Sequence, residues 1–398
     1  MIIKFFIALI FALCFMILGH YYIYHRIFEP FIGANNAFWM SGFLLLCGMF
    51  FLGFFVIRIL PQILKKIIEP IMFTWMGSLF IFLILCVLSF PIQMYFSYFG
   101  YSQKILSASL TVFGFCVIGY SIFQAFRKPA IISTFVPMPN TIPNEIENLV
   151  AVVLSDIHVS GLIGRRKMQR LVDMVNKLNP DVIFITGDLM DGSLKQLKKE
   201  IEPLKDLKAK EKIIYITGNH EYYSGPLVWK NHFKNYFNWL VLSNSSEILT
   251  FKGVTLNILG IEDKHWLNYE KIPRHQDKRI NKSIDHLHES REKIDNVPPI
   301  ENCVNILLAH QPKDARYLKP YPWINLQISG HTHGGQIWPI KYLVKKDQKY
   351  NVGLYKIQNN QYIYVNQGTG FWGPPMRLGT RCEITLMRFK KDCARVSP

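Results

Sequence analysis

The sequence predicts an α/β domain behind a membrane-spanning N-terminal third. Two observations support this prediction. The first 126 residues contain four long apolar segments and only six basic and two acidic side chains. After them, short apolar runs alternate with segments of helical spacing, which is the pattern of an α/β fold.

Each of the four apolar segments is close to the ~20 residues that span the hydrocarbon core of a bilayer. The segments are residues 5–23, 38–57, 72–90 and 105–126. A cleaved signal peptide would explain the first segment only, and no small-residue cleavage site follows it. We therefore expect a four-helix transmembrane domain at residues 1–126.

The basic residues of the short loops predict the orientation of these helices. With the N-terminus inside, only Arg26 and Lys104 would lie on the outer side. The inner side would carry Lys4, Arg58, Lys65, Lys66, Arg127 and Lys128. This bias predicts an integral inner-membrane protein with both termini and residues 127–398 in the cytoplasm. Those residues hold 39 basic and 26 acidic side chains. The basic excess would favour binding to an anionic leaflet and to phosphorylated substrates. Alternatively, it consists of ordinary solvated lysines.

The chain beyond residue 126 divides into several predicted parts. Residues 127–148 carry four prolines without a helical period, so we expect a linker there. Residues 262–300 form a charged, histidine-rich insert, either a substrate-facing lid or a solvated loop and helix, and residues 391–398 form a tail. Further predicted helices and strands are 165–178, 194–207, 253–261, 353–357, 361–365 and 383–389.

Five apolar runs are each followed by side chains that bind metal ions. The runs are residues 149–154, 181–186, 212–217, 304–309 and 324–329, and they predict buried strands. The side chains that follow them are Asp156, His158, Asp188, Asn219, His310, His331 and His333. On an extended backbone, Asp156 and His158 would point the same way. Because open α/β sheets place their sites at the C-terminal ends of strands, this repetition predicts one metal centre.

Seven candidate ligands are too many for one metal ion. Three or four protein ligands satisfy one open catalytic ion, so seven suit two ions that share a bridging ligand. A carboxylate can bridge and a neutral imidazole cannot, which leaves Asp188 or Asp156 as the bridge. Imidazole and carboxylate ligands together favour Mn, Fe, Zn or Co over Mg or Ca.

Such a centre suits the hydrolysis of a phosphate ester. Two ions a few ångströms apart promote in-line displacement at phosphorus, with metal-bound hydroxide as the nucleophile near neutral pH. The leaving group then needs a proton, and His220, directly after Asn219, is the natural general acid. Glu221 is a candidate to orient it. A single histidine is more often structural, but within this array we expect His220 to be catalytic.

Taken in order, these residues resemble the motifs of the calcineurin-like metallophosphoesterases. The matching stretches are Asp156-x-His158, Gly187-Asp188, Gly218-Asn219-His220-Glu221, His310 and Gly330-His331-Thr332-His333. The resemblance implies a catalytic domain at residues 149–390, built as a four-layer α/β/β/α sandwich with two mixed sheets. It also implies two ligand sets that share Asp188 as the bridge. The first set is Asp156, His158, Asp188 and His333, and the second is Asp188, Asn219, His310 and His331.

Finer features resemble the membrane-associated bacterial phosphoesterases of the YkuE and YaeI type. They include Tyr222-Tyr223-Ser224-Gly225, Ala309-His310-Gln311-Pro312 and the glycine-rich tail from residue 368 to residue 384. Some members of that group hydrolyse the pyrophosphate bond of UDP-2,3-diacylglucosamine. This chain departs from many members at Glu221, where they have Asp, and its 262–300 insert is longer than usual.

Together these features predict a membrane-anchored phosphodiesterase or pyrophosphatase that acts on a lipid-linked phosphate at the inner leaflet. We expect Arg377, Phe371 and Trp372 to bind the substrate, although packing beside the metal site would equally explain the two aromatic residues. One alternative is an anchored enzyme for soluble nucleotides. The other is a non-enzymatic metal-binding regulator attached to a transport or sensing unit. The membrane segments argue against it, because they lack the mid-span charges that transport pathways usually carry. No specific nucleic-acid motif is present.

Overall fold

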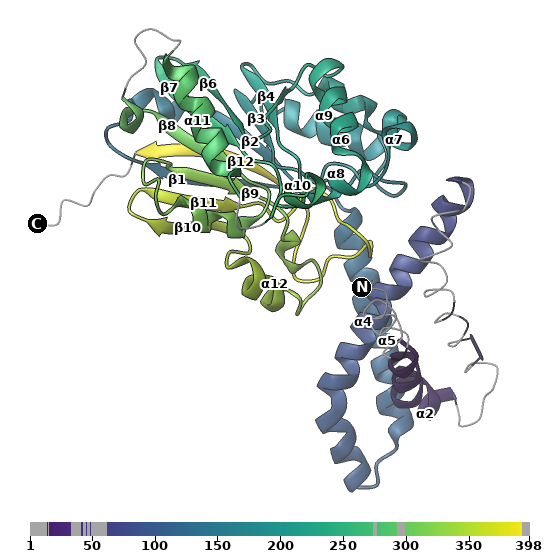
Figure 1. Cartoon of the computed structure of the whole chain (residues 1–398). Coiled ribbons are helices and arrows are strands. Elements are labelled where there is room, and N and C mark those ends of the chain that lie inside the picture. The colour runs from purple at the N-terminus through teal and green to yellow at the C-terminus, as the bar shows by residue number, and fades with distance from the viewer. Residues whose placement is uncertain are drawn as a thin grey trace, which may run out of the picture. The chain divides into compact units, whose positions relative to one another are not determined.

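The computed structural model contains two compact units. It describes residues 14, 16–32, 41–42, 45, 48, 62–273, 277–292 and 299–391. One unit comprises residues 1–126 with 373–378, and the other comprises residues 127–372 with 379–398. We call them the helical unit and the two-sheet unit. Figure 1 shows the helices of the first mainly in purple and blue, and the strands of the second from teal to yellow.

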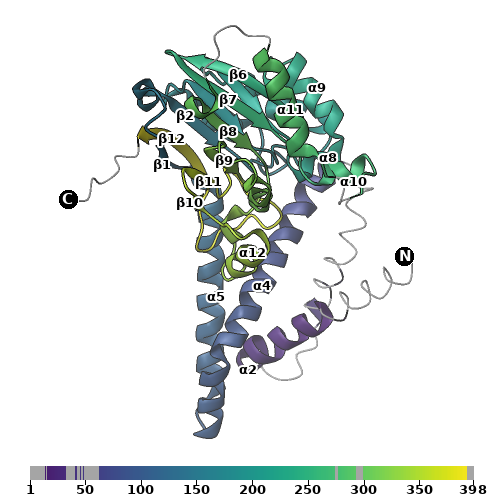
Figure 2. The same ribbon diagram turned by 60° about the vertical axis from the view of Figure 1, so that its left-hand side comes forward.

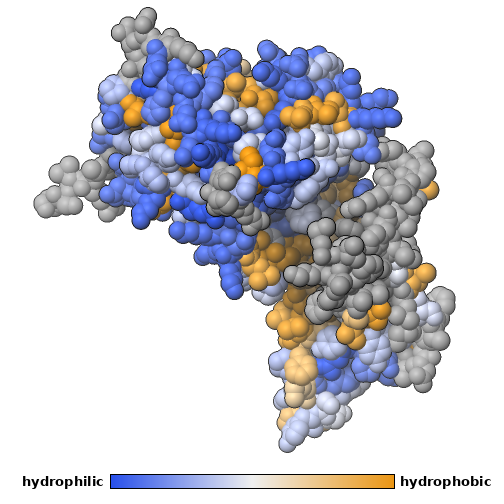
Figure 3. All heavy atoms as spheres, in the orientation of Figure 1, coloured by the Kyte–Doolittle hydropathy of each residue, from blue (hydrophilic) through white to orange (hydrophobic). Residues whose placement is uncertain are grey.

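The helical unit is built on two long apolar helices. Helix α4 spans Gln62–Tyr98, with Pro70 and Pro91 inside it, and α5 spans Gln103–Phe126. The segments Ile67–Tyr98 and Gln103–Phe126 are long and apolar enough to cross a membrane. The short elements η1 (Tyr24–Phe28) and α2 (Glu29–Ile32) precede them. The apolar composition of α4 and α5 is visible as orange residues in Figure 3.

These two helices contain the last two of the four predicted membrane segments. The predicted segment 38–57 lies outside the described residues except at positions 41, 42, 45 and 48. The segment 5–23 is described only at residue 14 and from residue 16 onward. Four membrane helices are therefore not confirmed, and the structure supports two.

Glycines allow close packing inside the helical unit. A Cβ atom added at Gly114 of α5 would lie 2.4 Å from a ring carbon of Phe82 on α4. One added at Gly77 of α4 would lie 2.6 Å from the sulfur of Met376. Small residues permit such approaches between apolar helices, so the segment 373–378 packs against α4 where a side chain is missing.

The two-sheet unit contains two mixed sheets of six strands (Figures 1 and 2). The first has the order β1-β12-β2-β3-β4-β5, and the second has the order β10-β11-β9-β8-β7-β6. In the first sheet β2, β3, β4 and β5 are parallel, and in the second β11, β9, β8 and β7 are parallel. The strands of the first are β1 (Ala130–Met138), β2 (Val150–Leu154), β3 (Val182–Ile185), β4 (Lys212–Tyr215), β5 (Leu240–Val241) and β12 (Glu383–Lys391). Those of the second are β6 (Ser245–Phe251), β7 (Val254–Gly260), β8 (Val304–Leu308), β9 (Leu326–Ser329), β10 (Gly353–Gln358) and β11 (Gln361–Val365). The two predicted mixed sheets are thus confirmed.

One hydrophobic core joins the facing sides of the two sheets. Val153 and Phe184 of the first sheet and Ile258 and Ile306 of the second are fully buried members of it. Full burial of such side chains contributes ~1.5–3 kcal/mol each. Strands β3 and β8 are buried along their whole length, which explains why their sequences are continuous apolar runs.

Helices cover the outer faces of the sheets. Helix α11 buries Ile284 and Leu287 in a second cluster with Leu307 of β8. Helix α9 places the ring of Phe233 4.9 Å from that of Tyr215 on β4, and α6 and α7 lie on the same side of that sheet in Figure 1. The helices are α6 (Arg165–Asn176), α7 (Leu194–Ile201), α8 (Asn219–Ser224), α9 (Pro226–Asn235), α10 (His265–Tyr269), α11 (Arg279–Glu292) and α12 (Lys341–Gln348). Helices α10 and α11 belong to the predicted 262–300 insert.

The prediction of a linker at residues 127–148 is wrong. Residues Ala130–Met138 form strand β1, which pairs in parallel with β12 along its whole length. Residues Asn144–Asn148 then form a short 3-10 helix, η2. Because β1 is the edge strand of its sheet, Pro137 removes no bond from the centre of the sheet. The prolines that suggested a linker are therefore compatible with a strand.

Candidate metal centre

All seven predicted ligands follow strands β2, β3, β4, β8 and β9, and six of them meet in two groups of ligand atoms. A third group joins one of them to two other residues, and the atoms of each group lie within 4.8 Å of one another. The groups are Asp156 with His158 and His333, Asp188 with His310 and His331, and His158 with Asp191 and His220. The predicted convergence of the strand ends is therefore present in the structure.

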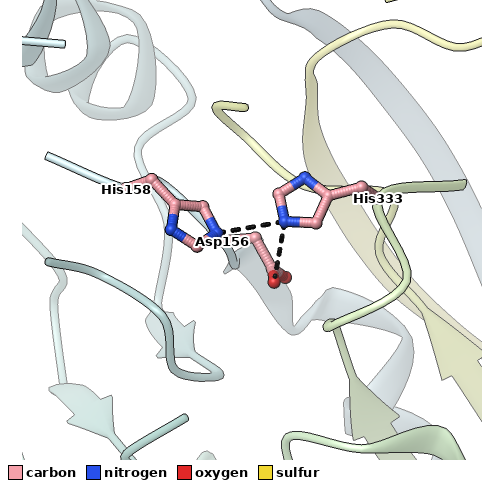
Figure 4. A group of neighbouring side chains, drawn as sticks. All are labelled: Asp156, His158 and His333. Carbon is pink, nitrogen blue, oxygen red and sulfur yellow. Dashed lines mark hydrogen bonds and ion pairs between the residues drawn. The ribbon is translucent and has the colours of Figure 1, made fainter. Parts of the chain in front are cut away.

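The first group consists of Asp156, His158 and His333 (Figure 4). His333 Nε2 lies 3.4 Å from Asp156 Oδ1 and 3.0 Å from His158 Nε2. All three residues are at most 3% exposed. The backbone amide of His331 donates to both oxygens of Asp156, at 3.0 and 2.9 Å, and the hydroxyl of Ser155 donates at 2.5 Å. These bonds fix the carboxylate beside the two imidazole nitrogens.

The second group is centred on Asp188 and His310. His310 Nε2 lies 3.2 Å from Asp188 Oδ2, 3.2 Å from Asn219 Oδ1 and 3.2 Å from His331 Nδ1. Asp188 Oδ2 also lies 3.9 Å from Nε2 of His158, which belongs to the first group. One carboxylate oxygen thus faces ligand atoms of both groups. This geometry favours Asp188 over Asp156 as a bridging ligand.

Five of the seven candidate ligands have a left-handed backbone conformation. Their φ angles are 50° at Asp156, 52° at His158, 52° at Asp188, 68° at His331 and 49° at His333. Such conformations cost ~1–3 kcal/mol each in residues other than glycine and cluster at functional sites. The expectation that an extended backbone aligns Asp156 with His158 is wrong. Their side chains converge because the chain turns sharply at each residue.

The outward nitrogens of two ligand imidazoles are held by oxygen atoms. His158 Nδ1 lies 2.8 Å from Asp191 Oδ1, and His310 Nδ1 lies 2.8 Å from the carbonyl oxygen of Thr186. Hydrogen bonds of this kind fix the ring and the tautomer of a metal-binding histidine. They direct Nε2 of both rings toward the ligand groups.

His220 lies beside the ligand groups and is bonded to a residue that sequence reasoning missed. Its Nδ1 lies 2.7 Å from Asp191 Oδ1, and its Nε2 lies 4.0 Å from Asp188 Oδ2. Burial alone would lower the pKa of His220, but Asp188 and Asp191 raise it to about 9. The two carboxylates therefore favour the protonated form of the imidazole. In the sequence, only its position three residues after Asp188 could have indicated Asp191, because no strand ends there.

Glu221 accepts hydrogen bonds from the backbone. Its carboxylate receives the amide of Gly218 at 2.7 Å and the amide of Asp188 at 3.1 Å. These bonds tie the loop after β3 to the start of α8, which fixes Asp188 relative to that helix. The side chain bonded to His220 Nδ1 is Asp191, so we assign the orientation of His220 to Asp191. A catalytic role for Glu221 stays a prediction.

The charges of the pocket suit the ligand forms of Asp156, Asp188 and His331. Burial opposes ionisation of Asp156, but His333 and His310 lower its pKa. Burial likewise opposes ionisation of Asp188, and His310 lowers its pKa. Burial and the neighbouring His310 lower the pKa of His331 to about 4. The carboxylates are thus anions and His331 is neutral, which are the forms that bind metal ions.

The donor set fits two divalent transition-metal ions. Two groups of buried imidazole and carboxylate atoms lie side by side and meet at Asp188. Burial lowers the pKa of His310, but Asp188 outweighs it and raises that pKa, as it does for His220. The pocket therefore attracts cations, and mixed nitrogen and oxygen ligands suit ions such as Mn, Fe or Zn.

One of the three predicted substrate-binding residues lies beside this pocket. The ring of Trp372 is centred 6.1 Å from that of His220, and the residue is 48% exposed. Phe371 is only 3% exposed, with the ammonium group of Lys167 over its ring. Arg377 is fully buried and belongs to the helical unit. The roles of all three in substrate binding stay predictions.

Comparisons with known proteins agree with this geometry. The family profile described as "Calcineurin-like phosphoesterase" matches residues 149–335. A Bos taurus protein named "Transmembrane protein with metallophosphoesterase domain" is 36% identical over 273 residues, which are 67% of this chain and 58% of that protein. This chain therefore spans less than two thirds of the length of that relative.

Two bacterial proteins are also similar over most of their length. A Helicobacter pylori protein named "Uncharacterized metallophosphoesterase" is 33% identical over 281 residues, which are 69% of each chain. The "Uncharacterized metallophosphoesterase YkuE" of Bacillus subtilis is 28% identical over 284 residues, which are 68% of this chain and 90% of that protein. The resemblance to metallophosphoesterases therefore includes a relative named as a transmembrane protein and two bacterial relatives.

Proposed function

This chain belongs to the calcineurin-like phosphoesterase family of metal-dependent phosphoester hydrolases, and on that premise we propose that it is a membrane-anchored, two-metal phosphodiesterase or pyrophosphatase. The observation that carries the proposal is the position of Asp188 Oδ2. It lies 3.2 Å from His310 Nε2, 3.9 Å from His158 Nε2 and 4.0 Å from His220 Nε2. One oxygen thus connects both ligand groups to the candidate general acid.

We assign the ligands in two sets that share Asp188. Asp156, His158 and His333 complete the first, and Asn219, His310 and His331 complete the second. When bound, two divalent ions such as Mn, Fe or Zn activate the attacking water and offset negative charge on the phosphate oxygens. The polypeptide supplies the fixed positions, because five of these residues are held in strained conformations by the surrounding loops.

His220 donates the proton that the leaving group needs. Asp191 accepts the hydrogen bond from Nδ1–H, which leaves Nε2–H free to face the reacting group. Because Asp188 and Asp191 raise the pKa of His220 to about 9, the donating form predominates at neutral pH. General acid catalysis of this kind is worth roughly 10²–10⁴ in rate.

The proposed substrate is a lipid-linked phosphodiester or pyrophosphate such as UDP-2,3-diacylglucosamine. The support for it is the pair of helices at Ile67–Tyr98 and Gln103–Phe126, which have the length and composition of membrane spans. Anchoring in a bilayer raises the effective concentration of a lipid substrate. The basic residues of the predicted loops, Lys4 and Arg58 among them, favour the cytoplasmic side for both termini and the catalytic unit.

The test is hydrolysis by the full-length, manganese-loaded protein in detergent micelles. UDP-2,3-diacylglucosamine and the soluble diester bis(p-nitrophenyl) phosphate are compared, with His220→Ala as the active-site variant. His288→Ala, an exposed histidine on α11, is the matched control. We expect the lipid to be cleaved at least a hundredfold faster than the soluble ester, and His220→Ala alone to lose this activity.

Other outcomes separate the parts of the proposal. If only the soluble ester is cleaved, the hydrolytic reaction stands and the lipid substrate is wrong. If His220→Ala retains full activity, the assignment of the general acid is wrong. If the protein binds manganese at two sites and cleaves neither compound, a regulatory role becomes the better explanation.

A further inference from the structure

Two large aromatic side chains near His220 are exposed. The ring of Tyr223 is centred 5.3 Å from that of His220, and the ring of Trp372 is centred 6.1 Å from it. Tyr223 is 65% exposed and Trp372 is 48% exposed. Both rings lie at steep angles to the imidazole, 67° and 61°. We call this pair the aromatic ledge.

Tyr223 is held in place despite its exposure. Its hydroxyl lies 3.3 Å from Nε2 of His265, the first residue of α10. His265 in turn donates from Nδ1 to Asp263 at 2.6 Å. The other oxygen of Asp263 accepts a hydrogen bond at 2.6 Å from the side chain of Gln311, which directly follows the ligand His310. The position of the tyrosine is thus linked to the strand that carries a metal ligand.

Trp372 is held through its backbone by a residue of the other ligand loop. The side chain of Gln336 donates to the carbonyl oxygen of Trp372 at 2.8 Å and accepts from its amide at 3.3 Å. Gln336 is buried and lies three residues after the ligand His333. Aromatic side chains have few rotatable bonds, so an exposed ring on an anchored backbone loses little conformational entropy when a ligand binds.

We propose that the aromatic ledge binds the planar ring of a nucleoside on the leaving-group side of the phosphate. This inference rests on the proposed function, in which His220 protonates the leaving group. A group that receives a proton from His220 lies next to this imidazole, whose ring is close to those of Tyr223 and Trp372. Stacking between a base and an aromatic side chain tolerates different bases, because every base has a π-face.

The polar atoms of the ledge favour a nucleoside over an acyl chain. The Tyr223 side ends in a hydroxyl group and in the imidazole of His265, whose side chain is 27% exposed. A base or a ribose offers further hydrogen-bonding atoms to these polar groups, whereas an acyl chain offers none. The ledge would therefore bind the nucleotide part of a nucleotide-activated lipid, and the lipid part would lie elsewhere.

The test compares two phosphates that differ only in the presence of the nucleoside. Uridine 5′-monophosphate and methyl phosphate are titrated by calorimetry into the full-length, manganese-loaded protein in detergent. We expect the nucleotide to bind at least tenfold more tightly than methyl phosphate, and Trp372→Ala to reduce that ratio about tenfold. Trp372→Phe keeps a ring and should preserve the ratio within about threefold. Tyr342→Ala, at an exposed tyrosine of α12, is the matched control.

The result that would overturn the inference is an unchanged ratio in both Trp372→Ala and Tyr223→Leu. It is equally overturned if dodecyl phosphate, but not the nucleotide, loses affinity in these variants, because the ledge would then bind acyl chains. A failure of the proposed function gives a different result. In that case the wild-type protein cleaves no diester, while the affinities of the two phosphates still show whether the ledge binds a nucleoside.

Discussion

The metal pocket and the aromatic ledge lie next to each other but are built in different ways. The pocket is made of buried residues such as Asp156 and His310, which follow strands of the two sheets. The ledge is made of exposed rings that a short helix and a loop carry, namely Tyr223 and Trp372. On the proposed function, the buried residues that follow the strands carry the reaction, and the exposed rings beside them select the substrate.

The largest effect should come from the residue that we assign to both ligand sets. Asp188→Asn keeps the shape but removes the charge next to His310 and His158. We expect a loss of roughly 5.4 kcal/mol of transition-state stabilisation, about 10⁴-fold in kcat/KM, because both ions depend on this carboxylate. Metal analysis should show fewer than two ions per chain. Asp173→Asn on the exposed face of α6 is the control, and two tightly bound ions in Asp188→Asn would contradict the shared role.

Loss of the general acid should be the next largest effect. His220→Asn removes the donor at Nε2 but leaves the predicted ligands unchanged, so metal content should stay at the wild-type value. We expect kcat to fall about 10²–10³-fold. A leaving group that needs no proton, such as p-nitrophenolate, should show a much smaller loss than an alkoxide. Equal losses for both leaving groups would exclude His220 as the acid.

The sequence predicted the pocket far better than the ledge, and the reason is physical. Asp156, Asp188 and His310 follow apolar runs that only a buried strand explains, so their meeting point could be inferred. Asp191 and Gln336 follow no strand, and their roles depend on loop conformations that the sequence does not display. Strand β1 was missed for a related reason, because prolines are compatible with an edge strand as well as with a linker.

The pH dependence of the reaction should separate Asp191 from the ligands. Asp188 and Asp191 raise the pKa of His220 to about 9, so the protonated acid is present below that pH and is lost above it. In Asp191→Asn one anion beside Nδ1 is gone, so the pKa of His220 should fall. The alkaline limb of kcat should then move to lower pH by about one unit, with a loss of about twofold at pH 8 that grows to roughly ninefold at pH 10. A pH profile identical to that of the wild-type protein would assign Asp191 to ligand positioning alone.

The smallest expected effect tests whether the two regions are independent. Tyr223→Phe keeps the ring of the ledge but removes the hydroxyl that lies 3.3 Å from His265 and 3.5 Å from Nδ2 of Asn219. Because stacking needs only the ring, nucleotide binding should weaken by less than about threefold. Metal affinity should fall by tenfold or less, since the amide of Asn219 loses only one outer partner. Calorimetric titration with manganese and with uridine 5′-monophosphate measures both effects. If metal affinity falls by much more than about tenfold, the hydroxyl supports the metal pocket as well as the ledge, and the two regions are not independent.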